Sequence, residues 1–264
     1  MSARFNGLTQ GWSLRKQGES MKALILAAGY GTRLATVIKD TPKPLIPVGN
    51  RPLIDYVVDK LQDIKSLTEI VVVSNNKFTP HFQQWAGSRK GLPIRVVNDG
   101  TNTPEERLGS VGDIRFVWQK ESSMDDWLVI GGDNLFDGDL SEYVDFAVLK
   151  SPAMTIGVYD IKDIPAATKF GVVAIDAHQK VISFQEKPKE PASSLITMCL
   201  YYFSKETLGY LPEYLSQSKA VDAAGSYIQW LSEKKNVYGF QFSGKWYDIG
   251  SIESLEEARA HFNK

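Results

Sequence analysis

A glycine-containing loop near the start of the chain has the residues of a phosphate-binding site. The segment LAAGYGTRL, residues 26–34, follows an apolar run and carries glycines at 29 and 31 and an arginine at 33. Glycine lacks Cβ and tolerates positive φ, so its backbone amides can approach an anion closely. The segment lacks both the third glycine of G-x-G-x-x-G and the G-K-[ST] ending of a P-loop. It predicts either another type of phosphate loop or a plain chain turn.

A second segment supplies a further basic group. DTPKPLIPVGNRPLI, residues 40–54, follows directly and holds Lys43 between two prolines, which stiffen its backbone. Arginine binds phosphate as a planar fork and lysine binds it as a point charge. Arg33 and Lys43 together suit a polyphosphate clamp, whereas each alone suits a solvated surface charge equally well.

Three later motifs supply carboxylates and another lysine: GGDN with Asp133, QEKP with Glu186 and Lys187, and WYDIGS with Asp248. Two carboxylates that converge on phosphate oxygens suit Mg²⁺, which retains several waters. Taken singly, either aspartate also suits a helix cap or a turn, and the QEKP pair suits solvated charges. Because Glu186 and Lys187 are adjacent on an extended segment, we expect their side chains to point in different directions.

Short buried strands alternate with helices in the first part of the chain and position these motifs. KALILAA, EIVVVSNN, LPIRVVND and DWLVIGGDN predict strands, while the apolar spacing of residues 53–64 predicts a helix. Further helices are predicted near FTPHFQQWA and from about Gly109. This order predicts a mostly parallel sheet with helices on both faces, whose ligands bind at the carboxyl ends of the strands. The glycine loop and GGDN both lie at such ends.

The pattern changes after about residue 150. AMTIGVYDI, FGVVAIDA, KVISFQEKP and LITMCLYYF predict strands linked by short turns, before helical patterns and WYDIGS. We therefore expect a single domain over residues 21–264, with a nucleotide-binding half at 21–150 and a substrate-binding half at 151–264. Residues 1–20 are polar and aperiodic, so we expect a leading segment outside the fold: a tag, an upstream start, a docking tail or a disordered leader.

Composition limits the classes of function. The 264 residues are 43% hydrophobic with a formal net charge of −1, which suits a globular protein and gives no overall basic field for nucleic acid. The one cysteine, Cys199, excludes an internal disulfide and is expected to be a packed, inert thiol. No apolar run approaches the roughly 18 residues of a membrane span, and no signal peptide is evident. We expect a cytoplasmic protein whose partners include neither nucleic acid nor a membrane.

The ordered set LAAGYGTRL, TPKPLIPVGNRPLI, GGDN, FQEKP and WYDIGS resembles the sugar-phosphate nucleotidyltransferases, especially the glucose-1-phosphate thymidylyltransferases, over about residues 22–261. Each motif is common, whereas the combination is specific. The resemblance implies a GT-A-like, Rossmann-type α/β fold. It also implies an Mg²⁺-dependent reaction of a nucleoside triphosphate with a sugar 1-phosphate, which yields a nucleotide-sugar and pyrophosphate, in a homo-oligomer.

The resemblance further implies roles for individual residues. Joining two anionic phosphates requires alignment and charge neutralisation rather than a nucleophilic side chain. The family pattern gives the catalytic charges to Arg33, Lys43 and Lys187, and the metal to Asp133 and Asp248. Nucleotide contacts fall on Leu26, Ala28, Gly29, Gly31, Thr32 and Gly109, and sugar-phosphate contacts fall on Asn134, Phe170, Gly171, Glu186, Lys187 and Thr197.

Departures from the family pattern leave the substrates open. NTPEERLGSVGDI stands where the thymidylyltransferases carry a Q-x-x-x-x-G-L-A segment for the base, and residues 197–199 stand where V-T-G lies beside the sugar. Because the β-helix appendage of the ADP-glucose and N-acetylglucosamine versions is not found after Leu255, we expect another version. One alternative function is a cytidylyltransferase for another phosphorylated alcohol, such as phosphocholine. Another is a non-catalytic nucleotide-sugar-binding subunit.

Overall fold

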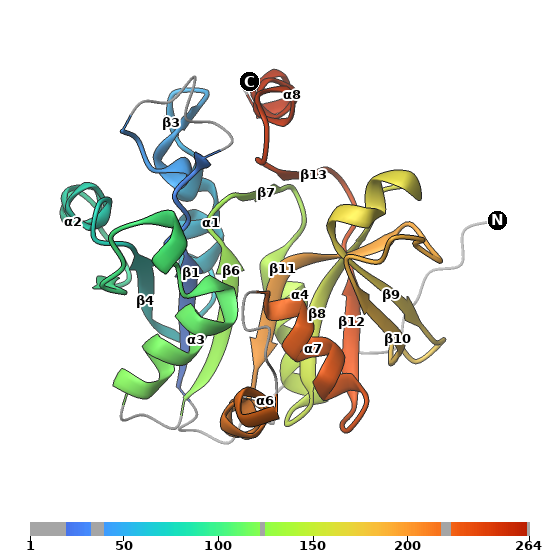
Figure 1. Ribbon diagram of the computed structural model, residues 1–264. Helices are drawn as coiled ribbons and strands as arrows, with labels where there is room; N and C mark the ends of the chain where they lie inside the picture. The colour runs from blue at the N-terminus through green and yellow to red at the C-terminus, as the bar shows by residue number, and fades with distance from the viewer. Residues whose placement is uncertain (1–19, 33–39, 122–124, 218–222, 263–264) are drawn as a thin grey trace.

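The central feature of the protein, in a computed structural model that describes residues 20–32, 40–121, 125–217 and 223–262, is one large sheet (Figure 1). Nine strands of this described part form it, in the order β10-β9-β11-β6-β1-β4-β5, with β8 and β12 joined through β11. Four strands are parallel, as the sequence predicted, because each returns through a helix. They are β1 (Met21–Leu26), β4 (Leu67–Ser74), β5 (Ile94–Asn98) and β6 (Asp126–Gly131).

Helices cover both faces of this parallel part, which confirms the predicted layers. Alternate residues of β1 point to opposite faces: Ala23 and Ile25 belong to one apolar cluster and Leu24 to the other. The first cluster contains the apolar stripes of α1 (Leu53–Gln62), α2 (Thr79–Gly87) and α4 (Leu140–Lys150). The second contains those of α3 (Gly109–Lys120) and α7 (Ala224–Ser232). Burial of these apolar stripes holds the helices against the two faces of the sheet and so fixes the positions of the strand ends.

The second half of the chain adds antiparallel strands to the same sheet. They are β8 (Met154–Asp160), β9 (Gly171–Ile175), β10 (Val181–Glu186) and β11 (Leu195–Phe203), and β12 (Val237–Gln241) lies parallel to β8. The long β11 pairs antiparallel with β6, β8 and β9 and so joins the halves. A bridge between Lys180 and Tyr238 brings β12 back toward β10, so this part of the sheet curls. Two helices, α5 (Lys205–Gly209) and α6 (Leu211–Gln217), precede α7.

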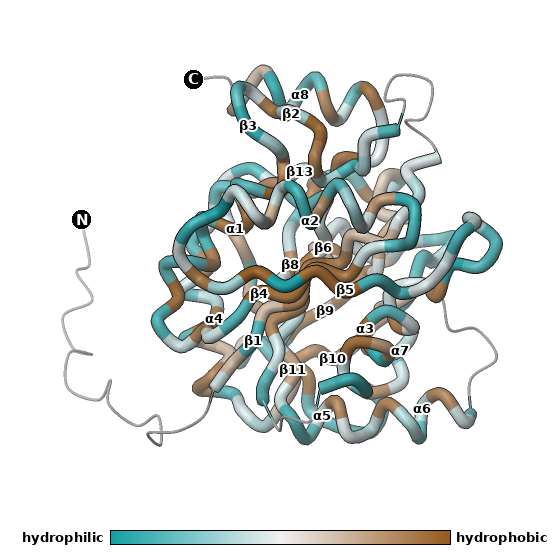
Figure 2. Tube along the Cα trace, turned by 90° about the vertical axis from the view of Figure 1, so that its left-hand side faces the viewer, coloured by the Kyte–Doolittle hydropathy of each residue, from teal (hydrophilic) through white to brown (hydrophobic). Residues whose placement is uncertain are grey.

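A small layer lies above the carboxyl ends of the parallel strands (Figure 2). It contains two short ribbons, β2 (Pro47–Val48) with β3 (Arg51–Pro52) and β7 (Asn134–Phe136) with β13 (Trp246–Asp248), followed by α8 (Ile252–Phe262). Leu255 and Ala258 of α8 pack on Ile46, Val48 and Leu135. The segment that carries the WYDIGS motif is thereby fixed against the segment that follows Lys43.

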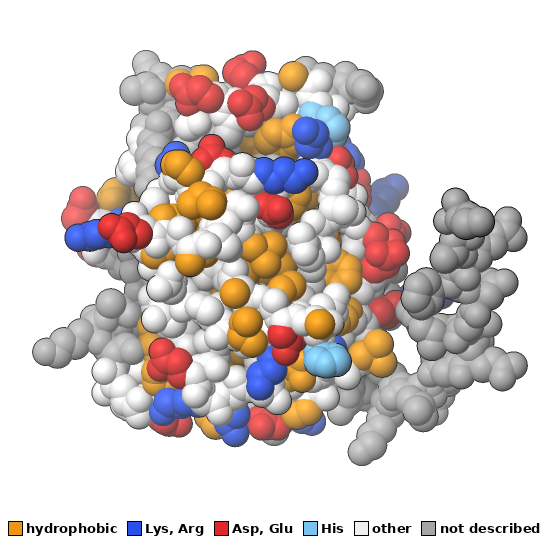
Figure 3. All heavy atoms as spheres, turned by 90° about the vertical axis from the view of Figure 1, so that its right-hand side faces the viewer, with side chains coloured by type: hydrophobic (Ala, Val, Ile, Leu, Met, Phe, Trp, Pro, Cys, Tyr) orange, Lys and Arg blue, Asp and Glu red, His pale blue; other side chains and the backbone are white. Residues whose placement is uncertain are grey.

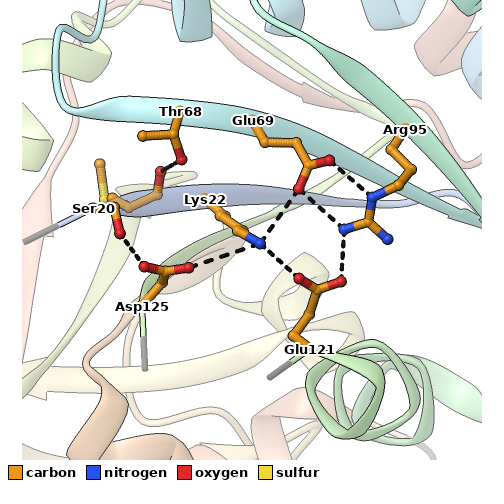
Figure 4. Close-up of polar contacts among 8 residues, drawn as sticks. Ser20, Lys22, Thr68, Glu69, Arg95, Glu121 and Asp125 are labelled. Carbon is orange, nitrogen blue, oxygen red and sulfur yellow. Dashed lines mark hydrogen bonds and ion pairs between the residues drawn. The ribbon is translucent and has the colours of Figure 1, made fainter. Parts of the chain in front are cut away.

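The opposite, amino end of the parallel strands is closed by a network of charged side chains (Figure 4). Lys22 of β1 contacts Glu121 at 2.6 Å, Glu69 of β4 at 3.5 Å and Asp125 at 3.8 Å. Arg95 of β5 contacts Glu69 at 2.8 Å and Glu121 at 2.6 Å. Each charge therefore has an opposite charge beside it, and the network ties neighbouring strands together.

The surface of the second half has no single dominant character in the view of Figure 3, where apolar side chains lie in small groups among charged ones. Ile182 of β10 and Ile164 are among the exposed apolar residues. Such scattered exposure is ordinary for a protein surface. No helix of the described residues is long and apolar enough to cross a membrane.

Candidate active site

A pocket of about 340 Å³ lies at the carboxyl ends of β1 and β6 and beside the β7–β13 ribbon. The glycine loop, with Leu26, Gly29, Gly31 and Thr32, forms one side of it. The structure thus brings the first and last sequence motifs to one place. The rest of its lining is Ala27, Tyr30, Lys43, Pro44, Pro104, Arg107, Asp133, Asp248 and Gly250.

The glycine loop needs glycine for its backbone and leaves space above it. Gly31 has φ +63°, which L residues with a Cβ rarely adopt, and no atom lies within 4 Å of where a Cβ of Gly29 or Gly31 would be. The side chain of Asn75, at the end of β4, donates to the carbonyl of Ala28 at 2.9 Å and so fixes the loop to the neighbouring strand end. Ala28 itself is buried and outside the pocket lining. The predicted catalytic Arg33 lies outside the described residues.

Lys43 and Asp133 form an ion pair inside this pocket. The Lys43 ammonium lies 2.6 Å from Asp133 Oδ2, although the two residues are 90 positions apart. Prolines on both sides of Lys43 hold it in a short 3-10 turn over residues 43–45. A Cβ on Gly132 would lie 2.9 Å from both the Leu26 carbonyl and the Pro44 ring. Glycine at that position therefore lets the Asp133 loop approach the glycine loop and Lys43.

The β7–β13 ribbon brings Asp248 to the same pocket from the far end of the chain. Asp248 pairs with Asn134 across the ribbon, and the amide of Ile249 donates to the carbonyl of Asp133 at 3.1 Å. No cluster of three or more His, Cys, Asp or Glu in the described part of the chain forms a metal site. Two carboxylates beside an open pocket fit Mg²⁺, which takes its other ligands from water and phosphate.

Five of the six predicted sugar-phosphate residues, all except Asn134, lie together, and none of the six is in the lining of this pocket. A Cβ on Gly171 would lie 2.9 Å from Thr197 Oγ1 and 3.1 Å from Glu186 Oε2, so these side chains converge on one glycine. Burial raises the pKa of Glu186, while the charge of Lys187 acts in the opposite direction. The amide of Lys187 donates to the carbonyl of Phe170 at 3.0 Å, which adds Phe170 to the same group of residues.

The expectation that Glu186 and Lys187 point in different directions was wrong. Lys187 has φ +45°, so the extended backbone of β10 ends there and the alternation of side chains ends with it. Its ammonium comes within 3.7 Å of Glu186 Oε1 while the side chain stays 58% exposed. The lysine therefore stands at the edge of the site, and the carboxylate lies deeper.

Cys199 lies between the two groups of residues. It has φ +51° at the point where the β11–β8 register shifts between Thr197 and Tyr201, and it is half-buried rather than fully packed. Burial raises the pKa of its thiol to about 12, and the nearby carboxylates of Asp133, Asp248 and Glu186 raise that pKa further. The thiol thus stays protonated, in agreement with the expectation of an inert group.

Two contacts at the site have no motif that predicts them. The Trp246 indole donates to Asn134 Oδ1 at 2.7 Å, which fixes the amide of that residue beside Asp133. Tyr30 donates to Thr101 Oγ1 at 3.2 Å and joins the glycine loop to the segment after β5. Trp246 stands within WYDIGS, two residues before Asp248, and its position there is the one available signal.

Gly109, predicted to bind nucleotide, starts α3 with φ +72° and is outside the pocket lining.

The site therefore combines a glycine loop whose backbone a ligand can approach closely, one partly exposed ion pair and a second carboxylate around an open space. Such a site can hold a polyphosphate and neutralise charge that moves onto its oxygens. It presents neither a nucleophile with an adjacent base nor a reactive thiol among the described residues.

Sequence comparisons identify the class. The family model described as nucleotidyl transferase matches residues 22–264. The bifunctional protein GlmU of Methanococcus aeolicus is 28% identical over 92% of this chain and 55% of its own length. The glucose-1-phosphate adenylyltransferase of Fervidobacterium nodosum is 30% identical over 89% of this chain and 59% of its own length. The chain belongs to the nucleotidyl transferase family, and it spans less than two thirds of these two curated relatives.

Solved structures agree on the fold. A putative glucose-1-phosphate thymidylyltransferase from Bacillus anthracis, in complex with a sucrose, superposes with a TM-score of 0.80 and 26% identity over 93% of this chain and 96% of that chain. A UDP-glucose pyrophosphorylase complexed with UDP-glucose superposes with a TM-score of 0.78 at 19% identity, which shows the fold alone. The predicted α/β nucleotidyltransferase fold is confirmed.

Proposed function

We propose that this protein condenses a nucleoside triphosphate with a sugar 1-phosphate to give a nucleotide-sugar and pyrophosphate. The observation that carries the proposal is the meeting of Lys43, Asp133 and Asp248 at a pocket bordered by the glycine loop. An oxygen of the sugar phosphate attacks the α-phosphorus, a new P–O bond forms, and the bond to the β-phosphate breaks. Pyrophosphate leaves with the electron pair. In-line transfer of this kind depends on alignment and charge neutralisation.

The nucleotide-binding half holds the triphosphate in this proposal. The loop amides around Gly29 and Gly31 approach the phosphates, and the Lys43 ammonium moves from Asp133 to the phosphate oxygens. Arg33 stays a proposed partner of the same oxygens. Asp133 and Asp248 would bind Mg²⁺, which would supply charge neutralisation and orientation of the α-phosphate when bound. The residues thus stabilise the charge that develops on the leaving group.

The substrate-binding half holds the sugar phosphate. Lys187 is exposed at the edge of the site and can meet an anionic phosphate, while Glu186 lies deeper, where a carboxylate accepts hydrogen bonds from sugar hydroxyls. Phe170, Gly171, Thr197 and Asn134 complete the proposed sugar subsite. Two relatives whose names state a reaction differ in the nucleotidyl group, adenylyl or thymidylyl, and both names contain glucose 1-phosphate. They support the reaction class and leave the base open, and the departure from the family pattern at residues 197–199 leaves the sugar open. A homo-oligomer and a cytoplasmic location stay predictions.

A matrix of substrates tests this proposal. Purified protein is incubated with Mg²⁺, with ATP, CTP, GTP, TTP or UTP, and with several sugar 1-phosphates or phosphocholine, and both pyrophosphate and product mass are measured. We expect pyrophosphate and a nucleotide-sugar from at least one sugar pair. Release with phosphocholine alone would favour the cytidylyltransferase alternative. Triphosphate binding without release from any pair would favour a non-catalytic subunit.

A further inference from the structure

Two chain segments each form part of the wall of this pocket. One wall is the glycine loop, from which Tyr30 faces the pocket, and the other is the loop after β5, residues 99–107, from which Pro104 and Arg107 face it. Pro104 begins a single 3-10 turn, Pro104–Glu106. The hydroxyl of Tyr30 donates to Thr101 Oγ1 at 3.2 Å and so links the two walls.

The direction of this hydrogen bond follows from the next one. Thr101 Oγ1 lies 2.8 Å from Asp99 Oδ1, and the Thr101 amide donates to the same oxygen at 2.7 Å. The hydroxyl of Thr101 has one hydrogen, which goes to the carboxylate, so its oxygen can only accept from Tyr30. The order is therefore tyrosine hydroxyl to threonine hydroxyl to carboxylate. Thr101 and Asp99 are both buried, so water does not compete for the hydrogen bond between them.

The end of β4 holds the wall that contains Thr101. The carbonyl of Thr101 accepts from the Asn76 amide at 2.9 Å, and the Asn98 side chain accepts from the Gly100 amide at 2.8 Å. Gly100 has φ +86°, which a turn at this point requires. The acceptor for Tyr30 is therefore a fixed point of the fold. The tyrosine side chain, which is half-buried, is positioned relative to it.

Lys43, Asp133 and Asp248 mark where the phosphates belong. Lys43 and Asp133 form their ion pair there and Asp248 lines the same pocket, whereas the two walls offer the aromatic ring of Tyr30 and the apolar ring of Pro104, with Arg107 also on the Pro104 wall. A nucleoside has the complementary surface, because its base presents flat apolar faces to an aromatic side chain. The two parts of the lining thus suit the two parts of a nucleoside triphosphate.

We propose that Tyr30 is a positioning residue for the nucleoside part of the triphosphate, held in place by Thr101 and Asp99. This inference rests on the proposed function and concerns how the same site binds its nucleotide. The Tyr30 ring packs against the nucleoside from the glycine-loop side, and Pro104 contributes the apolar ring of the other segment. Without the hydroxyl the ring is no longer held in place, so the nucleoside binds more weakly, while binding of the phosphates stays unchanged.

The test measures binding by calorimetry, without turnover. The probes are Mg²⁺ with whichever of the five common nucleoside triphosphates binds the wild-type protein most tightly, and Mg²⁺ with inorganic tripolyphosphate, which has no nucleoside. Tyr30→Phe and Thr101→Val each remove the hydroxyl–hydroxyl contact. Thr101→Ser keeps a hydroxyl. Tyr56→Phe is the matched control, because Tyr56 donates its hydroxyl to the Val48 carbonyl at 2.9 Å outside the pocket lining.

We expect Tyr30→Phe and Thr101→Val each to raise the Kd of the nucleoside triphosphate by about 5- to 10-fold, the effect of one lost hydrogen bond. The double variant should be little worse than either single one, because both remove the same contact. The Kd of tripolyphosphate should change less than about 2-fold. Thr101→Ser and Tyr56→Phe should keep the wild-type Kd of the nucleoside triphosphate.

Three results overturn the inference: an unchanged Kd in Tyr30→Phe, equal weakening of nucleoside triphosphate and tripolyphosphate, or fully additive effects in the double variant. Its failure is distinguishable from failure of the proposed function. A wild-type protein that releases pyrophosphate while Tyr30→Phe binds normally contradicts only the role of Tyr30. Binding that follows the expected pattern without any turnover contradicts only the proposed reaction. Wild-type protein that binds no nucleoside triphosphate overturns both.

Discussion

The two ends of the central sheet both gather charged side chains, and they use them differently. At the amino end Lys22 and Arg95 each form ion pairs with both Glu69 and Glu121, and the two carboxylate side chains are only 21% and 9% exposed. At the carboxyl end Lys43 pairs with Asp133, whose side chain is 34% exposed and faces an open pocket. Charges that satisfy each other in a packed layer stabilise the fold. Charges around an open space are available to a ligand.

The backbone at the site contains two non-glycine residues with positive φ. They are Lys187 and Cys199, and others, such as Lys162 and Gln179, lie elsewhere in the described chain. A non-glycine residue at positive φ costs free energy, so its presence near an open pocket indicates a geometric requirement there. Substitutions at the carboxyl end should therefore change activity, and substitutions at the amino end should change stability.

The largest effect is expected at the two pocket aspartates. Asp133→Asn and Asp248→Asn should each lower kcat by about 10² to 10⁴, because in the proposed function both would bind the same metal beside the phosphates. The double variant should be little worse than the poorer single one. Steady-state pyrophosphate release measures both points. Fully additive losses, or turnover that persists in EDTA without added metal, would falsify the shared-metal interpretation.

Lys43 should come next, and Lys22 gives a matched control at the other end of the sheet. Lys43→Met should lower kcat by about 10² with a small change in melting temperature, because its ammonium neutralises phosphate charge. Lys22→Met removes a lysine that also pairs with a carboxylate at 2.6 Å, and should lower the melting temperature while kcat stays normal. Equal losses of kcat in the two variants would contradict the proposed difference between the ends.

Lys187 separates the two substrates. Lys187→Ala should raise the KM for the sugar phosphate by about 10-fold or more and leave the KM for the nucleotide within about 2-fold, because its exposed ammonium meets the incoming phosphate. Initial rates with each substrate varied in turn give both constants. Equal changes in the two constants would contradict the division of the chain into a nucleotide-binding and a sugar-phosphate-binding half.

The smallest effect is expected at Glu69, and it depends on pH. Hydrogen bonds from Arg95 hold the pKa of Glu69 below its ordinary value of 4.5, so its ionised form stabilises the folded state at neutral pH. That contribution is complete above the unfolded pKa and is lost as pH falls through the folded pKa. Glu69→Gln should lower the melting temperature by about 2–4 °C at pH 7, and the difference should shrink toward pH 3. A difference that grows toward acid pH would contradict this.

The sequence predicted the parallel part of the fold well, because its strands are short, mostly apolar segments that alternate with helical patterns. It also predicted strands at FGVVAIDA and LITMCLYYF, but not that β11 would pair with β6 and join the two halves. That pairing depends on contacts between residues about 70 positions apart, which local periodicity does not contain. The same reason hides the Trp246–Asn134 and Tyr30–Thr101 contacts and the charge network at the amino end.

Motifs predicted the site residues as a group, and local geometry corrected the details. Asp133 and Asp248 meet through the β7–β13 ribbon, which is too short to be predicted from its sequence. The alternation expected of Glu186 and Lys187 failed at one residue with positive φ, which nothing in the residue type lysine predicts. Ala28 and Gly109 lie outside the pocket lining, so their proposed contacts with nucleotide are less direct than those of Gly29 and Gly31.

The most direct test of the account compares one variant from each end of the sheet in the same two assays. Asp133→Asn and Glu69→Gln each replace one carboxylate by an amide, and both are assayed for pyrophosphate release with the best substrate pair and for melting temperature at pH 7. We expect Asp133→Asn to lose at least about 10² in kcat with a nearly unchanged melting temperature, and Glu69→Gln to melt at a lower temperature with normal kcat. Normal turnover in Asp133→Asn, or a comparable loss of turnover in Glu69→Gln, would contradict it.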